Sequence, residues 1–217
     1  MKKTVLLALI SVFALQMKAQ VNEPGKFYIN LKAGYNMANI TLLDEFGADP
    51  RHALNVGISG EYAVNERIAI EPGIFYSLQG SVFNISTVNL HLNSDYLVVP
   101  LYLKAYAAKG FNLFAGPQFS YLARSRIFVK TGEKWVDGIL SIVSNNIDLT
   151  KYENNYDVAI VLGLGYQTPF GFNISANYNI GLMNVPDLPD FTLGDKTFTL
   201  NPIAKNRVFQ LNIGYRF

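Results

Sequence analysis

Cysteine is absent from the 217 residues, which excludes disulfide bridges and any zinc or iron–sulfur site held by thiolates. Charged residues are scarce at 16%, and 18 basic residues against 16 acidic ones leave a formal net charge of +2. So small a positive excess argues against a nucleic-acid partner. Half of the residues are hydrophobic, which excludes disorder. Beyond the N-terminus, however, the sequence lacks any apolar run long enough for a membrane-spanning helix.

The N-terminus has the pattern of an export signal. Lys2 and Lys3 precede an apolar stretch over residues 4–15, and the small residue Ala19 follows shortly after. We therefore predict a signal peptide over residues 1–19, cleaved after Ala19. The alternative, an uncleaved anchor, fits less well because a spanning helix needs about 20 apolar residues. Cleavage would remove three lysines and no acid, changing the formal charge from +2 to −1.

From residue 27 onward, hydrophobic residues recur at every second position, which is the period of a strand with one apolar and one polar face. Eight such segments are present, near residues 27–35, 54–62, 68–78, 97–105, 111–121, 156–166, 172–182 and 209–217. Short turns alternate with long polar stretches, which lie at roughly 37–52, 79–94, 125–155 and 183–206. The pattern predicts that residues 20–217 form one all-β domain, an eight-stranded antiparallel transmembrane β-barrel with short periplasmic turns and long extracellular loops.

A soluble lipocalin-like ligand-binding barrel would also have alternating strands, but with the apolar face inside. Two features of the sequence disfavour it. The polar faces consist mostly of Gly, Asn and Ser, whereas a soluble surface carries about a quarter to a third of charged residues. Aromatic residues also gather at both ends of the apolar face, as in the two girdles at a membrane's interfaces. The apolar face is therefore expected to meet lipid.

The other face would then fill the lumen, where charges must pair or meet water. Charged residues on this face are Lys32, Glu61, Arg67, Glu71, Lys104, Arg124, Asp157 and Arg216. We expect Glu61 and Glu71 to share the cations of Lys32, Lys104 and Arg216 in a structural charge network; the alternative is a proton or ion path. A diffusion pore is not expected, because eight strands enclose only enough room for side chains.

Signs of catalysis are weak. The sequence has no P-loop, no GxSxG and no HExxH motif. His52 and His91 are the two histidines, and Ser94 and Asp95 follow His91 closely enough to suggest a small lipid-modifying enzyme as an alternative. Such residue types are ordinary in polar loops, so we predict a non-enzymatic protein without catalytic, cofactor-binding or metal-binding residues.

The stretch over residues 125–155 contains Trp135 and several aliphatic residues. It is predicted to extend a hairpin above the membrane. An exposed strand edge there could bind a protein partner by β-augmentation, and the alternative is that the loop hairpins pack on each other.

From residue 27 to residue 217 the chain resembles the PorT-like family of outer-membrane β-barrel proteins. Three segments carry the resemblance: Lys32–Asn39, Tyr96–Lys104 and the terminal Phe209–Phe217. The last segment, with Tyr215 and Phe217, resembles the signal by which barrel-assembly machinery selects its clients. The family has no catalytic residues, and some members assist protein secretion.

The resemblance implies export to the outer membrane of a Gram-negative envelope. The expected partners are outer-membrane lipid, the barrel-assembly machinery and a protein at the extracellular loops. The expected role is adhesion, envelope integrity or assistance to a secretion or surface complex.

Overall fold

The computed structural model describes residues 22–41, 49–85, 88–108, 110–131, 134–136, 139–141, 144–148, 150, 155–184, 191–193, 196–198 and 204–217. The predicted signal peptide lies outside these ranges. Among the described residues, no helix has the length and apolar character needed to cross a membrane.

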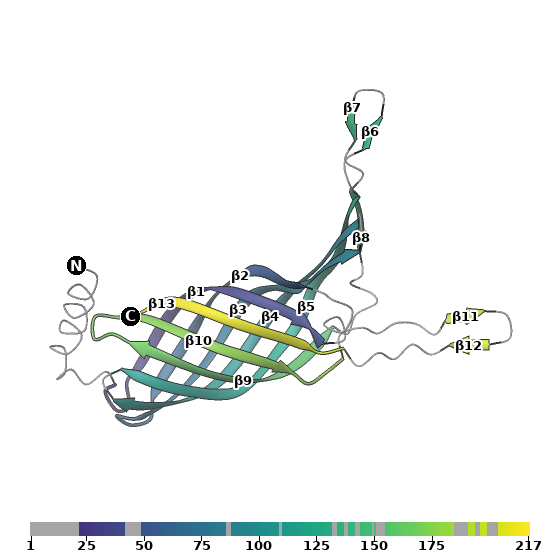
Figure 1. Cartoon of the computed structure of the whole chain (residues 1–217). Coiled ribbons are helices and arrows are strands. Elements are labelled where there is room, and N and C mark those ends of the chain that lie inside the picture. The colour runs from purple at the N-terminus through teal and green to yellow at the C-terminus, as the bar shows by residue number, and fades with distance from the viewer. Residues whose placement is uncertain are drawn as a thin grey trace, which may run out of the picture.

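Eight strands form the wall of a closed barrel (Figure 1). They are β1 (Phe27–Ile40), β2 (Asp49–Ala63), β3 (Ile68–Ile85), β4 (Val88–Ala108), β5 (Phe111–Thr131), β9 (Tyr156–Gln167), β10 (Phe172–Gly181) and β13 (Asn206–Arg216). Each pairs antiparallel with its two neighbours in the order β4-β3-β2-β1-β13-β10-β9-β5, and the pairing of β4 with β5 closes the ring. The prediction of an eight-stranded antiparallel barrel is confirmed.

Five shorter strands lie outside this ring. They are β6 (Lys134–Val136), β7 (Ile139–Ser141), β8 (Ser144–Asp148), β11 (Phe191–Leu193) and β12 (Lys196–Phe198). β6 pairs with β7 and β11 pairs with β12, whereas β8 pairs with the loop end of β5.

The two faces of the wall have opposite polarity. Leu54 of β2 and Ile213 of β13 point outward with 63% and 66% of their surface exposed, while Glu61 of β2 is fully buried. The alternation continues along the wall strands, with an irregularity in β5 at Ala123, so an apolar surface surrounds a mainly polar interior. A soluble barrel has the reverse arrangement, because its apolar face must leave water.

The short turns and the two described ends of the chain lie at one end of the barrel, which we call the turn end (Figure 1). Between β2 and β3, the side-chain carbonyl of Asn65 accepts hydrogen bonds from the backbone N–H groups of Arg67 and Ile68, each at 2.8 Å. Between β4 and β5, Gly110 has a φ of +89°, and a Cβ there would lie 1.9 Å from the carbonyl oxygen of Gln167. These local bonds and the free φ of glycine make tight connections at this end.

The opposite end, the loop end, departs from the sequence prediction over residues 79–94. Strands β3 and β4 continue through this stretch and pair from Ile68↔Ala105 to Ile85↔Val88. β5 also continues past the wall, to Thr131, and pairs with β8 there. The upper parts of β3, β4 and β5, together with β8, form a sheet that rises from one side of the wall (Figure 1). We call this sheet, residues 82–85, 88–94, 124–131 and 144–148, the extension.

Candidate functional site

Five charged side chains meet inside the barrel near its turn end. They come from five different strands and belong to Lys32, Glu61, Glu71, Lys104 and Arg216. The structure therefore brings together all five residues that the sequence analysis assigned to the lumen charge network. Their formal charges sum to +1, because three cations surround two carboxylates.

Glu61 is fully buried and contacts two of the cations. Its Oε2 lies 2.7 Å from Nζ of Lys104, and its Oε1 lies 3.2 Å from Nη1 of Arg216. The hydroxyl of Tyr106 donates a hydrogen bond to the same Oε1 at 2.6 Å. Three donors thus compensate the desolvation of one carboxylate.

Glu71 is satisfied in the same way. Its Oε2 lies 3.0 Å from Nζ of Lys104, and its Oε1 accepts hydrogen bonds from Nζ of Lys32 and the hydroxyl of Ser59. Lys104 therefore bridges both carboxylates, and no direct contact between the carboxylates is needed.

Arg216 ties this network to the N-terminal residues of the barrel. Its Nη1 donates to Oδ1 of Asn22 at 3.0 Å, and its guanidinium lies over the ring of Tyr28 at 4.1 Å from the centroid. Sequence reasoning missed Asn22, Tyr28 and Tyr106. Tyr106 had a detectable signal, because it follows Lys104 by two residues and therefore shares its inward face.

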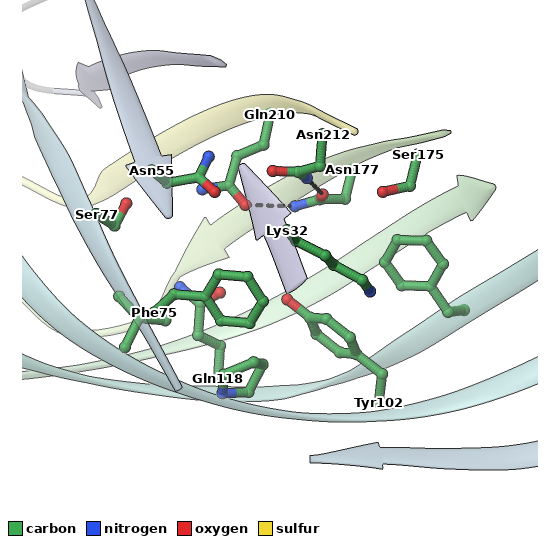
Figure 2. A pocket seen from close by; sticks show the side chains of 13 residues that line it. Lys32, Asn55, Phe75, Ser77, Tyr102, Gln118, Ser175, Asn177, Gln210 and Asn212 are labelled. Carbon is green, nitrogen blue, oxygen red and sulfur yellow. Dashed lines mark hydrogen bonds between the residues drawn. The ribbon is translucent and has the colours of Figure 1, made fainter. Parts of the chain in front are cut away.

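Amide side chains fill the lumen above the charges. Asn36 accepts hydrogen bonds from Asn55 at 2.6 Å and Gln210 at 2.9 Å, and Asn177 donates to Gln210 at 2.8 Å. Figure 2 shows Asn177 between Gln210 and Asn212, facing Lys32 and Tyr102 across a small cavity. This cavity has a volume of about 30 Å³. At this level the lumen holds side chains rather than an aqueous channel.

The sequence analysis placed three further charged residues on the inner face, and none of them lies in the charge network. Asp157 is buried, at the loop end, and accepts a hydrogen bond from Asn206 at 2.9 Å, apart from the network. The prediction was wrong for Arg67 and Arg124, which are both exposed. Arg67 lies in the turn between β2 and β3. Arg124 follows an irregularity in which the register steps from Tyr96↔Leu122 to Asp95↔Arg124, and the extra residue, Ala123, turns the next side chain outward.

The residues of the enzymatic alternative do not form a catalytic arrangement. Ser94 is buried on the inner face of β4, whereas His91 and Asp95 follow the alternation onto its outer face. Asp95 accepts a hydrogen bond from the hydroxyl of Tyr76 at 3.2 Å. His52 is also outside, where its ring stacks on Tyr35 with a centroid distance of 5.7 Å. A serine nucleophile and its base would have to lie on one face within hydrogen-bond reach.

The two residues predicted as a barrel-assembly signal lie at the end of β13, on the outer face. Tyr215 is 38% exposed and Phe217 67% exposed, and their ring centroids are 4.8 Å apart. The backbone N–H of Phe217 donates to the carbonyl of Ile29 at 2.9 Å, which continues the seam between the first and last strands. The last aromatic side chains of the sequence thus lie at the pairing of β13 with β1.

A closed ring of eight strands with an apolar outer wall and a filled polar lumen defines a transmembrane β-barrel. The sequence model of the family "Outer membrane protein beta-barrel domain" matches residues 18–187. The chain belongs to this family and is an outer-membrane β-barrel protein.

Solved structures with a similar fold include Ail, the attachment invasion locus protein of Yersinia pestis. It is 14% identical over 90% of this chain and all of its own, with a TM-score of 0.46. Neisserial surface protein A is 15% identical over 88% of this chain and 95% of its own, with a TM-score of 0.43. CarO2 of Acinetobacter baumannii is 12% identical over 88% of this chain and 99% of its own, with a TM-score of 0.47. No curated protein sequence matches the chain significantly.

Proposed function

We propose that this protein is a non-enzymatic outer-membrane barrel that presents the extension to a protein partner, as part of adhesion, envelope integrity or a secretion or surface complex. The observation that carries this proposal is the edge of the extension. Strand β8 pairs with β5 along Arg126↔Asp148 to Lys130↔Ser144, and no second strand pairs with it among the described residues.

An unpaired strand edge presents a row of backbone N–H and C=O groups to which a strand of another chain can add. In the wall this cannot happen, because closure of the ring leaves no edge there. The extension is therefore the part of the described sheet that can offer such hydrogen bonds outside the membrane.

The filled interior of the barrel favours a protein that presents the extension to a partner over one that transports a solute through its lumen. The five charges and the amide layer occupy the lumen, and the cavity among the amides has a volume of only about 30 Å³. A barrel of eight strands has no room for a solute channel beside such side chains. A PorT-like role is compatible with this picture and remains a prediction, as do the assembly machinery and outer-membrane lipid as partners.

Removing the β5–β8 part of the extension tests the proposal. The backbone N–H of Ser125 donates to Oγ1 of Thr150 at 3.0 Å, so residues 125 and 150 can be joined by a short turn that removes residues 126–149. In a control variant, residue 131 is joined to residue 144, which removes β6 and β7 but leaves the β5–β8 pair. We expect chemical crosslinking in intact cells to lose its outer-membrane complexes in the first variant and to keep them in the second.

Both variants should migrate as folded barrels in gels run with and without heating. Retention of the crosslinked complexes after removal of residues 126–149 would contradict the proposal. So would their equal loss when only β6 and β7 are removed.

A further inference from the structure

The cavity of about 30 Å³ in the lumen lies directly beside the charge network. Side chains of β1, β2, β3, β4, β5, β10 and β13 line it. One of them is Lys32, the residue that pairs with Glu71 in the network. The space is open to a guest of the size of a water molecule or a monatomic ion.

Four hydrogen-bond donors from four different strands border this cavity. They are the ammonium of Lys32, the hydroxyls of Tyr102 and Ser175, and the amide Nε2 of Gln118. Figure 2 shows both hydroxyls pointing toward Lys32. Gln118 is only 4% exposed, and its Oε1 accepts a hydrogen bond from Asn179 at 3.2 Å. Within the described part of the chain, neither the two hydroxyls nor Nε2 of Gln118 donates a hydrogen bond.

One buried acceptor lines the same cavity but faces another way. Oδ1 of Asn212 has no hydrogen-bond partner among the described residues. It lies against the backbone of Gly34, where an added Cβ would collide with it. The four donors are therefore left without an acceptor from this side chain.

The charge network beside the cavity has a surplus of positive charge. Three cations share two carboxylates, and the buried carboxylate of Asp157 lies apart at the loop end, where it accepts from Asn206. A net charge buried away from water is costly unless an opposite charge compensates it. The ammonium of Lys32 repels a cation from the cavity, whereas an anion there balances the surplus.

We propose that this cavity binds one monatomic anion, a halide such as chloride. The ammonium of Lys32 supplies the opposite charge, and Tyr102, Ser175 and Gln118 donate hydrogen bonds to the ion. Hydrogen bonds to a charged acceptor are stronger than those to a neutral one, which favours a halide over water at this position. This proposal does not depend on the partner of the extension.

The first test is the dependence of unfolding on the anion. A ligand that binds only the folded barrel raises its stability with ligand concentration. For wild-type protein in vesicles, we expect the urea midpoint of unfolding to rise with sodium chloride and then to level off. Sodium gluconate at the same ionic strength should not raise it, because gluconate is too large for the cavity. Crystals grown in bromide should show one anomalous scattering peak beside Nζ of Lys32.

Gln118→Glu is the sharpest variant, because it places a carboxylate in the cavity with almost no change of shape. Its charge replaces that of the ion, so the urea midpoint should no longer depend on chloride and the bromide peak should be absent. Gln79→Glu is the matched control, since Gln79 is 3% exposed on the inner face of β3 and does not line the cavity. It should keep the chloride dependence of wild type.

Tyr102→Phe removes one donor and keeps the ring. It should weaken the binding of chloride about tenfold, as expected for the loss of one hydrogen bond to a charged group. The concentration of chloride at which the urea midpoint levels off should therefore be about ten times higher than for wild type.

Three results would overturn the proposal. The first is an equal urea midpoint of wild-type protein in chloride and gluconate. The second is a cavity without a bromide peak, which would show that it takes up water only. The third is a Gln118→Glu variant that keeps the chloride dependence of wild type. If Gln118→Glu lacks the heat-dependent gel mobility of a folded barrel, an unchanged affinity for chloride in Tyr102→Phe refutes the site.

Discussion

Nζ of Lys104 lies 2.7 Å from Oε2 of Glu61, although β4 and β2 are not adjacent in the wall and β3 separates them. The same holds for two of the other three pairs of the network. Lys32 of β1 reaches Glu71 of β3 across β2, and Arg216 of β13 reaches Glu61 of β2 across β1. Three of the four ion pairs therefore join strands that share no backbone hydrogen bonds, whereas Lys104 and Glu71 lie on the paired strands β4 and β3. Together the four pairs connect the inner faces of five strands.

Removing the bridging cation should strongly destabilise the barrel. We expect Lys104→Ala to lower the free energy of unfolding by about 3–5 kcal/mol, because two buried carboxylates lose a shared partner. Urea unfolding in lipid vesicles, followed by gel mobility, measures this change. Lys26→Ala is the matched control, since Lys26 pairs with Glu23 at the exposed turn end and such pairs contribute less than about 1 kcal/mol. Equal unfolding midpoints for the two variants would contradict the prediction.

Neutralising Glu61 should relieve part of that cost. In the double variant Lys104→Ala with Glu61→Gln, the uncompensated charge is gone, so its destabilisation should be smaller than the sum of the single effects by about 0.5–3 kcal/mol. The four unfolding free energies of the cycle give this coupling energy. Additive single effects would show that Lys104 and Glu61 act independently, contrary to their contact.

Period-two alternation is sufficient to predict the inner and outer faces of the eight segments identified in the sequence, because lipid lies on one side of them and a packed lumen on the other. It also placed Lys32, Glu61, Glu71, Lys104 and Arg216 on one face. It could not show that Lys104 would bridge both carboxylates, since strand tilt and register decide which inward side chains meet.

Two features escaped prediction for physical reasons. Period-two alternation in the sequence does not reveal an extra residue such as Ala123, so it predicts the wrong face for Arg124. Outside the membrane no lipid selects apolar residues at alternate positions, so the sequence predicts a loop over residues 79–94, although residues 79–85 and 88–94 pair as strands.

A charge on the outer face at mid-height should be costly. Leu162 lies in the middle of β9 and is 54% exposed toward the surroundings of the barrel. In vesicles we expect Leu162→Lys to lower the free energy of unfolding by about 2–4 kcal/mol and Tyr156→Lys, at the loop end of the same strand, by at most about 1 kcal/mol. Urea unfolding in vesicles distinguishes them. Equal costs at both positions would show that β9 does not cross the hydrocarbon layer at Leu162.

Gly80 should not tolerate a side chain. Its φ is +133°, and a Cβ there would lie 2.0 Å from the backbone carbonyl oxygen of Leu92. We expect Gly80→Ala to cost about 1–3 kcal/mol, because both the φ and the space oppose it. Gly165→Ala is the control, since its φ is not positive and its shortest contact, at 3.0 Å, is to a side-chain oxygen of Asn112. A Gly80→Ala variant as stable as Gly165→Ala in urea would refute this prediction.

Phe217 should matter more for assembly in the cell than for the stability of the finished barrel. Its ring contacts Tyr215 on the outer face and is 67% exposed, so Phe217→Ala removes little buried surface. If the terminal aromatics are an assembly signal, this variant should lower the amount of folded protein in the outer membrane several-fold while refolding into vesicles normally. Phe27→Ala is the matched control, because Phe27 lies at the same end on the outer face and is 58% exposed, but begins the first strand. The two variants should unfold at similar urea concentrations. Equal amounts of both in the outer membrane would show that the terminal ring does not serve as a signal.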